Sequence, residues 1–332
     1  MKRLFFLLPL FLLTACGGDD EPNGNGNNNG NNGKPDTQVN ANKNDASVIT
    51  SLAGLEFPKI KGGDNNVIIT HKTPDYGITY SLEWDHSLRA QRWTCYNLTR
   101  TNYASNGNTR KSLWPDGDPW NYDPTIPAEE QQATYNELSK SYYPGTTDAY
   151  FEKGHICPSA DRLAAKDPNE QTYYMTNIMP MVKNFNGGIW QVMENRLRGW
   201  LGDPNKRTWS NYCDTLFVCK GGTIDKADQI LGYTVETASV NGEDKPHPGK
   251  HIIPKFYFMA LLAKKGDTYK AVGFWAEHLN EDRSNDPLGN YAVSIDKLEE
   301  LTGIDFFCNL PDDIETQVES AKTDEIKTNW GL

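Results

Sequence analysis

The feature that most constrains how this chain folds is a stretch in which two short extended segments lead into an amphipathic helix. The extended segments lie at residues 150–155 and 173–180, and a helical pattern covers residues 188–201. Each element carries a polar residue in an otherwise apolar context, so we expect a strand–strand–helix unit that gathers polar groups at one point. The apolar side chains that recur at helical spacing in the third segment are Ile189, Trp190, Met193, Leu197, Trp200 and Leu201.

The rest of the chain predicts an α+β domain with a central antiparallel sheet flanked by helices. Short runs rich in Val, Ile, Phe, Tyr and Trp, separated by Gly, Pro and Asp, predict strands joined by turns. Another helix is expected at residues 294–301, capped by Ser294. Residues 101–149 read as long loops with one helix near residues 128–139. The predicted strands cover residues 66–70, 78–84, 92–98, 215–219, 252–263 and 271–275.

The N-terminus is typical of an exported, lipid-anchored protein. Basic Lys2 and Arg3 precede an apolar run at residues 4–13, which is too short for an ordinary membrane span. The ending Leu-Thr-Ala-Cys at residues 13–16 resembles the lipobox of bacterial lipoproteins, in which the cysteine is acylated. We therefore predict a signal peptide at residues 1–16, membrane attachment through lipid on Cys16, and an outer-membrane lipoprotein that is periplasmic or surface-exposed. A cleaved signal with an incidental cysteine is the alternative.

Composition divides the remainder into a tether and one domain. Residues 17–46 consist mainly of Asn, Gly, Asp, Lys and Pro, with too few apolar residues to offset the entropy of ordering them. Residues 47–332 show no second linker and no internal repeat, so one domain is expected. The formal net charge of −11 argues against a protein that holds nucleic acid through a broad basic surface. A nucleic-acid substrate would have to be held locally.

Five cysteines follow Cys16, and their spacing does not match a zinc site. In an exported protein one or two disulfides are expected, and the sequence does not assign their pairing. Cys157 lies two residues from His155, but a small buried apolar residue is the better interpretation than a nucleophile or a metal ligand. The five are Cys95, Cys157, Cys213, Cys219 and Cys308.

The strand–strand–helix unit carries three spaced motifs. They are Glu152-Lys153-Gly154-His155, then Thr176-Asn177 with Pro180, then Phe185-Asn186 with Trp190, Met193 and Glu194. Together they resemble the DNA/RNA non-specific endonuclease family, the ββα-metal or His-Me finger nucleases that include secreted bacterial nucleases and mitochondrial endonuclease G. Residues 301–307 resemble the family's C-terminal signature, and the resemblance spans about residues 93–312.

Three positions depart from the family's pattern. Lys153 stands in place of an arginine and Glu152 in place of an aspartate, so the charges are kept while geometry and reach change. Met181 stands where the family usually has glutamine. None of these changes removes the expected base or ligand, so they bear on the rate of the reaction rather than on its type.

His155 is the predicted general base. Hydrolysis of a phosphodiester requires an activated water, and an imidazole with an ordinary pKa near 6.5 accepts a proton at neutral pH. His71, His86, His247, His251 and His278 lack the flanking motif, and we expect structural roles for them.

Asn186 and Glu194 are the predicted metal-site residues. The carboxamide oxygen of Asn186 is a hard ligand that suits Mg²⁺, which needs few protein ligands; Mn²⁺ is a possible substitute. As an alternative or in addition, Asn186 caps the helix that follows it. Glu194 lies two helical turns further on and is expected to fix metal-bound water, unless it is a solvated helix residue.

Asn177 and Arg110 complete the predicted catalytic set. Asn177 is expected to orient His155 or the phosphate, with a turn residue before Pro180 as the alternative. In the upstream loop, Arg110 resembles the family's phosphate-binding arginine, which would bind a phosphate oxygen with a charge-assisted hydrogen bond. Arg100 is the competing candidate.

The resemblance implies an endonuclease that hydrolyses DNA and RNA with little sequence preference and leaves 5′-phosphates. No base-reading element such as a recognition helix or zinc finger is evident. Two alternatives stay open: a surface lipoprotein with an inactive nuclease fold that binds nucleic acid or glycans, and a phosphodiesterase for small phosphate esters.

Overall fold

A computed structural model of the chain describes residues 39–203, 208–210, 212–235, 237–240, 243–246 and 250–332. The predicted signal peptide, Cys16 and most of the predicted tether lie outside these residues. Within the described part of the chain, no helix is both long enough and apolar enough to cross a membrane.

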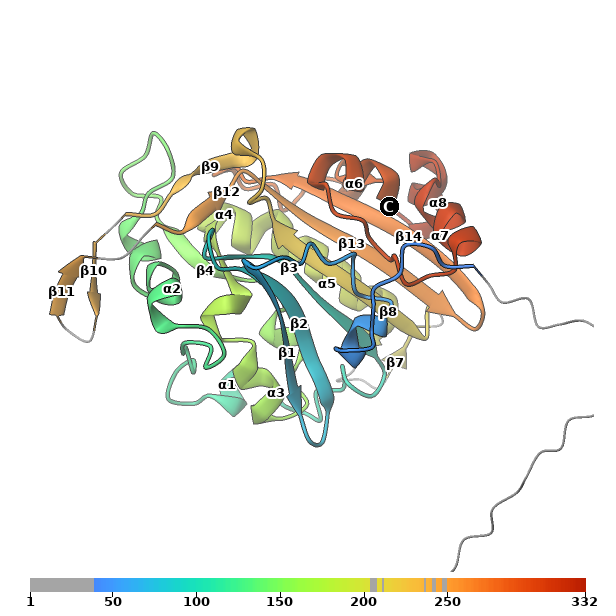
Figure 1. Ribbon diagram of the computed structural model, residues 1–332, viewed down its shortest axis with the longest axis horizontal. Helices are drawn as coiled ribbons and strands as arrows, with labels where there is room; N and C mark the ends of the chain where they lie inside the picture. The colour runs from blue at the N-terminus through green and yellow to red at the C-terminus, as the bar shows by residue number, and fades with distance from the viewer. Residues whose placement is uncertain (1–38, 204–207, 211, 236, 241–242, 247–249) are drawn as a thin grey trace, which may run out of the picture. The chain divides into compact units, whose positions relative to one another are not determined.

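A seven-stranded antiparallel sheet forms the centre of the domain (Figure 1). The six predicted strand segments are all confirmed, and the segment at residues 252–263 divides into two strands. Across the sheet the order is β1 (Asn66–Thr73), β2 (Gly77–Asp85), β3 (Ala90–Thr99), β8 (Thr215–Gly222), β13 (Phe256–Lys265), β14 (Thr268–Glu277) and β15 (Ala292–Val293). Four two-stranded sheets accompany it: β4 (Phe151–His155) with β5 (Ile178–Val182), β6 (Gly202–Asp203) with β7 (Thr208–Trp209), β9 (Ile230–Tyr233) with β12 (Ile252–Pro254), and β10 (Thr237–Val240) with β11 (Glu243–Pro246).

Helices cover both faces of this sheet. The α-helices are α1 (Arg110–Leu113), α2 (Ala128–Gln132), α3 (Lys166–Gln171), α4 (Lys183–Phe185), α5 (Gln191–Leu201), α6 (Ile295–Thr302), α7 (Asp312–Glu319) and α8 (Thr323–Trp330). Short 3₁₀ turns are η1 (Thr50–Ala53), η3 (Leu138–Lys140), η4 (Ser159–Asp161), η5 (Met175–Asn177), η7 (Ala227–Gln229) and η8 (Leu288–Asn290), and π turns are η2 (Ala133–Glu137) and η6 (Asn186–Trp190).

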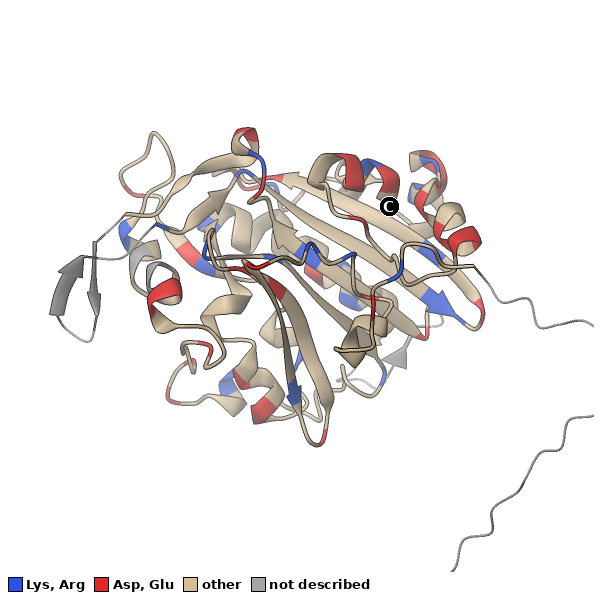
Figure 2. Cartoon of the chain, viewed as in Figure 1, with Lys and Arg blue, Asp and Glu red and all other residues tan. Residues whose placement is uncertain are grey.

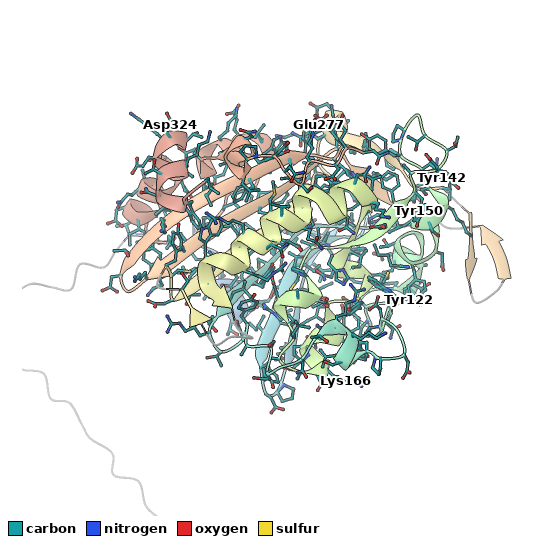
Figure 3. All side chains as sticks on the ribbon, turned by 180° about the vertical axis from the view of Figure 1, so that it is seen from behind. Tyr122, Tyr142, Tyr150, Lys166, Glu277 and Asp324 are labelled. Atoms are coloured by element: carbon teal, nitrogen blue, oxygen red, sulfur yellow. The ribbon has the colours of Figure 1, made fainter. Side chains whose placement is uncertain are left out.

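Two apolar clusters follow from the alternation of side chains along the strands. On β3, Tyr96 packs into one cluster together with Met193 of α5, whereas its neighbour Cys95 packs into the other together with Leu298 of α6. Val318 places α7 in that second cluster as well. Because both faces are covered, the central strands appear in the sequence as nearly continuous apolar runs. Figure 3 shows α5 lying in front of the sheet when the molecule is seen from behind.

The predicted helices are present, with one change at a start. Ser294 caps α6 by accepting from the backbone N of Lys297 at 3.1 Å, as predicted. The helix predicted from residue 188 begins instead at Gln191, because Gly188 has a non-helical backbone (φ −101°, ψ −119°) within a π turn. The helix predicted near residues 128–139 consists of α2, η2 and η3 in succession.

The folded unit begins earlier than residue 47. The compact unit runs from Gln38 to Leu332. Asn44 is buried and donates to the carbonyl of Pro58 at 2.9 Å, and Asn42 donates to the Glu315 carboxylate at 2.9 Å. The tether prediction was therefore wrong for residues 39–46, since asparagine amides, with Ala46 packed on the second apolar cluster, attach this segment to the domain.

The expectation of one or two disulfides was wrong for the described cysteines. All five are buried free thiols. Cys95 of β3 lies opposite Cys219 of β8 in the strand register, yet the two are not bonded. Burial raises the pKa of both thiols well above its ordinary value. These residues therefore serve as small apolar side chains of the core, a role that spacing in the sequence does not reveal.

Candidate active site

The predicted strand–strand–helix unit is confirmed. Strand β4 pairs antiparallel with β5, so that His155 lies opposite Ile178 at one end and Phe151 opposite Val182 at the other. From β5 the chain passes directly through α4 and η6 into α5. Gly154 is required beside His155, because an added Cβ would overlap the side chain of Met181 on the paired strand.

This unit lines a pocket of about 560 Å³. The structure brings four of the predicted site residues to it, namely His155, Asn186, Glu194 and Arg110. The lining has more cations than anions, although the whole chain carries a net charge of −11. This local excess of cations suits an anionic substrate. The ionisable and amide side chains that line it are Arg110, Glu152, Lys153, His155, Lys183, Asn186, Gln191, Glu194 and Arg198.

His155 lines the pocket, and one of its ring nitrogens has no hydrogen-bond partner among the described residues. The residue is half-buried, and its Nε2 atom is buried without a hydrogen-bond partner among the described residues. Its ring packs against Trp120 and Tyr173, at centroid distances of 5.1 and 5.0 Å. Trp190 Nε1 donates to the carbonyl of His155 at 3.3 Å and fixes the backbone. A buried polar atom without a partner is costly, so its retention here is consistent with a chemical role.

The surroundings keep His155 neutral. Burial, with a smaller contribution from the nearby cation Arg110, lowers the pKa of His155 to about 3, while Asp118 opposes the shift. A neutral imidazole is the form that accepts a proton. The electrostatics of the site therefore hold His155 in the state that a general base requires.

Asn186 is held with its amide oxygen available. Its Nδ2 donates to Glu152 Oε2 at 3.0 Å, and this bond settles which end of the amide carries the nitrogen. The alternative that Asn186 caps the helix is wrong, because Asn186 itself has helical dihedrals (φ −60°, ψ −53°) and its side chain reaches across to β4. The remaining Oδ1 atom is the one that can bind a cation.

Glu194 is buried beside a fully buried cation. Lys220 of β8 places Nζ 2.8 Å from Glu194 Oε1, and the same Nζ lies 4.8 Å from the centroid of the Trp190 ring. Burial raises the pKa of Glu194, while Lys220 and Arg198 oppose the rise. The alternative of a solvated helix glutamate is therefore wrong, and Lys220 positions this carboxylate at the pocket.

Arg110 lines the pocket, whereas the pocket lining does not include Arg100. Arg110 donates Nε to Asp118 Oδ1 at 2.7 Å and forms a second bond from Nη2 to Oδ2. Its guanidinium lies 5.3 Å from the centroid of the Tyr173 ring. Arg100 instead bonds the carbonyl of Ser210 at 3.4 Å. A guanidinium held by a carboxylate and an aromatic face is oriented in advance for a phosphate oxygen.

Asn177 does not reach the imidazole or the pocket, contrary to the role predicted for it. It is fully buried, and its amide bonds the backbone N and O of Cys157 and the carbonyl of Thr172, each at 2.8 Å. All three bonds go to backbone groups, two of them on Cys157 just after His155, so the side chain has no polar atom left for the imidazole or the pocket. Asn177 thus fixes the end of β4 and contributes to the site only through the backbone.

The remaining described histidines have structural partners, as expected. His71 bonds Asp123 at 2.8 Å, His86 bonds Glu130 at 2.9 Å, and His251 bonds the carbonyl of Arg89 at 3.0 Å. His278 bonds two backbone groups. His247 lies outside the described residues.

Lys220, Asp118 and Trp120 are site residues that the sequence analysis missed. Lys220 had a usable signal, since a single lysine in an apolar strand is a buried cation that needs a partner. Asp118 and Trp120 lie in a loop of irregular sequence, where no periodicity indicates which side chains turn inward.

The residues present fit a hydrated divalent cation of the magnesium type. Asn186 Oδ1 is a neutral oxygen ligand, and the carboxylates Glu152 and Glu194 line the same pocket and can accept hydrogen bonds from bound water. Few protein ligands and several waters are the pattern that Mg²⁺ favours.

Comparison with known proteins agrees with this geometry. A family model described as DNA/RNA non-specific endonuclease matches residues 65–313. The chain belongs to this family. It is therefore a nuclease, a hydrolase of DNA or RNA. The match confirms the predicted resemblance over residues 93–312 and extends it back through β1 and β2.

Relatives support the same assignment. A nuclease of Nostoc sp. is 30% identical over 274 residues, which cover 78% of this chain and 83% of that protein. The nuclease of Serratia marcescens is 26% identical over 268 residues, covering 78% and 82%. A chain in the crystal structure of the EndoG/EndoGI complex superposes with a TM-score of 0.54 at 17% identity, covering 79% of this chain and 94% of that chain. The fold is thus the ββα-metal nuclease fold.

Proposed function

We propose that this nuclease hydrolyses the phosphodiester bonds of DNA and RNA with little sequence specificity, using His155 as general base and one Mg²⁺ at Asn186. The main support is that His155 lines the same pocket as Asn186 and Glu194, and that its Nε2 atom has no hydrogen-bond partner among the described residues.

The imidazole of His155 accepts a proton from the attacking water. The water oxygen bonds to phosphorus while the bond from phosphorus to the 3′ oxygen breaks, and the leaving 3′ oxygen takes up a proton. The products are a 5′-phosphate and a 3′-hydroxyl. Because His155 is neutral in its pocket, no proton has to be removed from it first.

Asn186 and Glu194 hold the metal site. Bound Mg²⁺ supplies positive charge that stabilises the developing negative charge on the phosphoryl and leaving oxygens. Asn186 Oδ1 is the direct ligand, and Glu194 orients water at the site. Lys220 keeps the Glu194 carboxylate in place from behind, through the bond at 2.8 Å.

Cations on the pocket wall bind the substrate backbone. Arg110 offers a guanidinium to a phosphate oxygen, and Lys153, Lys183 and Arg198 add positive charge around it. The pocket contacts of the substrate are with phosphates, which DNA and RNA share, and this supports cleavage of both.

We also propose that Cys16 carries lipid and that the enzyme works in the cell envelope as an outer-membrane lipoprotein, in the periplasm or at the surface. The support is the N-terminal sequence: a short apolar signal followed by a lipobox-like ending at Cys16.

Digestion of plasmid DNA and of RNA by the purified full chain tests the proposal. Wild type and His155→Ala are compared in Mg²⁺ and in EDTA, with His86→Ala as a matched control outside the pocket. We expect Mg²⁺-dependent cutting of both substrates that is lost in His155→Ala and kept in His86→Ala. The labelled ends should carry 5′-phosphate.

No cutting of long DNA or RNA by folded wild type in any divalent metal would overturn the proposal in favour of an inactive binding lipoprotein. Hydrolysis confined to a dinucleotide diester would favour a phosphodiesterase for small esters instead.

A further inference from the structure

A second group of carboxylates lies away from the pocket, where α6 contacts α7. Asp296 and Glu299 are three residues apart on α6 and share a helix face, and Glu319 is the last residue of α7. One oxygen from each of the three lies within 4.8 Å of the other two. None of them lines the pocket of His155.

Glu319 is the member that makes this group unusual. It is only 8% exposed, and its Oε1 atom is buried with no hydrogen-bond partner among the described residues. Leaving an anionic oxygen buried and unpaired is strongly unfavourable in a folded protein. A carboxylate oxygen of Glu319 lies within 4.8 Å of oxygens of Asp296 and Glu299, so the surroundings of Glu319 add negative charge rather than compensate it.

Neighbouring groups supply no cation. In the part of the chain that the structure describes, Asp296, Glu299 and Glu319 form no ion pair with Lys or Arg. Burial and the carboxylates around it together raise the pKa of Glu319 to about 9. Burial likewise raises the pKa of Glu299 to about 7. Acidic residues are visible on both helices in Figure 2.

We propose that Asp296, Glu299 and Glu319 bind a calcium ion that joins α6 to α7. All three donors are carboxylate oxygens, which hard divalent cations prefer. The three oxygens lie within 4.8 Å of one another, close enough to bind one ion together. Calcium accepts a flexible set of carboxylate oxygens and waters, whereas Mg²⁺ requires near-ideal octahedral geometry.

The exposure of the three side chains fits the same ion. Asp296 is exposed, Glu299 is half-buried and Glu319 is buried, so one side of the site is open to water. Calcium takes about six to eight oxygen ligands, and water completes the set where the protein gives few. Such a site is expected to bind with a Kd of roughly 0.1–1 mM, the range of extracellular calcium modules.

The role of this site is to stabilise the second apolar cluster. Leu298 of α6 and Val318 of α7 both pack in that cluster, against strands of the central sheet. A cation between α6 and α7 would hold the two helices in place over this cluster and would neutralise the repulsion among the three carboxylates. The site acts on stability and is independent of the nuclease reaction.

Thermal unfolding of the full chain in EDTA and in 10 mM CaCl₂ or MgCl₂ tests the proposal. We expect calcium to raise the Tm of the wild type by roughly 3–6 °C. Glu319→Gln and Asp296→Asn should lose this rise, and Asp296→Asn changes only an exposed side chain. Glu300→Gln is the matched control, since it removes the same charge from the solvent-exposed side of α6, and it should keep the rise. Asn186→Ala should keep it as well, because its site lies elsewhere.

Equilibrium dialysis with ⁴⁵Ca²⁺ gives an independent readout of the same variants. Glu319→Gln should lose about one bound calcium per chain relative to Glu300→Gln. An unchanged Tm and no bound calcium in the wild type would overturn the proposal. An equal rise in Tm in Glu319→Gln, or a larger rise with Mg²⁺ than with Ca²⁺, would overturn the assignment of the site or of the ion.

Discussion

A histidine lies at each end of the two-stranded β4–β5 sheet: His155 at the end of β4, and His278, which follows β14, beside the end of β5. The two histidines differ in their hydrogen bonds. His155 stands where β4 ends, opposite Ile178, while His278 contacts Val182 at the other end of β5. Burial lowers the pKa of both, to about 3 for His155 and about 4 for His278. Burial and pKa therefore do not separate the two.

Hydrogen bonding separates them. His278 accepts from the backbone N of Val182 at 2.8 Å and donates from Nδ1 to the carbonyl of Pro254 at 2.9 Å, so both ring nitrogens are in use. His155 keeps Nε2 without a partner and lines a pocket. A histidine that the fold saturates is structural, and a histidine that the fold leaves unsaturated beside a pocket is available for chemistry.

The largest effect should come from His155→Ala. Loss of a general base is expected to lower kcat by roughly 10²–10⁴-fold. The Tm should fall less than in His278→Ala, because the packing against Trp120 and Tyr173 is lost but no hydrogen bond of Nε2 is. Single-turnover cleavage of an oligonucleotide measures the loss of rate, and thermal unfolding measures the Tm. A His155→Ala variant that kept the wild-type kcat would mean that His155, like His278, has only a structural role.

The opposite pattern is expected for His278→Ala. Removing the ring leaves the Val182 N–H and the Pro254 carbonyl buried without partners and opens a cavity, which should lower the free energy of unfolding by about 3 kcal/mol. Below the unfolding transition, kcat should stay within about threefold of the wild type. Urea unfolding and the cleavage assay together measure this pattern, and a large loss of kcat in a folded variant would contradict it.

Lys220→Met should weaken Mg²⁺ binding at the pocket of His155, with an effect on cutting smaller than that of His155→Ala. Methionine keeps the length but leaves the Glu194 carboxylate without the Nζ bond at 2.8 Å. Loss of a group that supports a metal site typically weakens metal binding by about 10–100-fold, so the Mg²⁺ concentration for half-maximal cutting should rise by that factor. Lys264→Met on the neighbouring strand is the matched control. Equal Mg²⁺ dependence in both variants would mean that Lys220 serves only the core.

The smallest effect is a pH slope at the structural end. A histidine whose pKa falls from about 6.5 when unfolded to about 4 when folded stabilises the protein fully above pH 6.5, and this contribution is lost as the pH falls towards 4. His278→Gln should therefore reduce the decline in the free energy of unfolding over that interval by up to about 1.4 kcal/mol per pH unit. Unfolding curves from pH 7 to pH 4 measure the slope, and parallel curves for the two proteins would show that His278 does not contribute.

Much of the fold and part of the site followed from the sequence. Alternating and apolar runs predicted the strands, and helical periodicity predicted α5, because both patterns reflect which faces are buried. Motif order placed His155, Asn186, Glu194 and Arg110 in one site. These predictions hold mainly because His155, Asn186 and Glu194 lie on elements that are close together in the sequence, so that local structure brings their side chains together.

What the sequence did not show depends on pairing between distant segments. Lys220 meets Glu194 only because β8 passes behind α5, and Asn177 turns inward to backbone because η5 is buried. Likewise, Asp296 and Glu319 are far apart in the sequence and come together only because α6 packs against α7. Charge and amide groups have no periodicity that reveals a tertiary partner.

Chemical rescue of His155→Gly tests the assigned base most directly. Imidazole is added to the folded variant in Mg²⁺, and cutting of plasmid DNA is compared with that of His278→Gly under the same conditions. We expect imidazole to enter the open pocket and to restore part of the cutting in His155→Gly, in proportion to its neutral form. The rate of His278→Gly should stay unchanged. Wild-type cutting by His155→Gly without imidazole, or equal stimulation of both variants, would contradict the assignment of His155 as the general base.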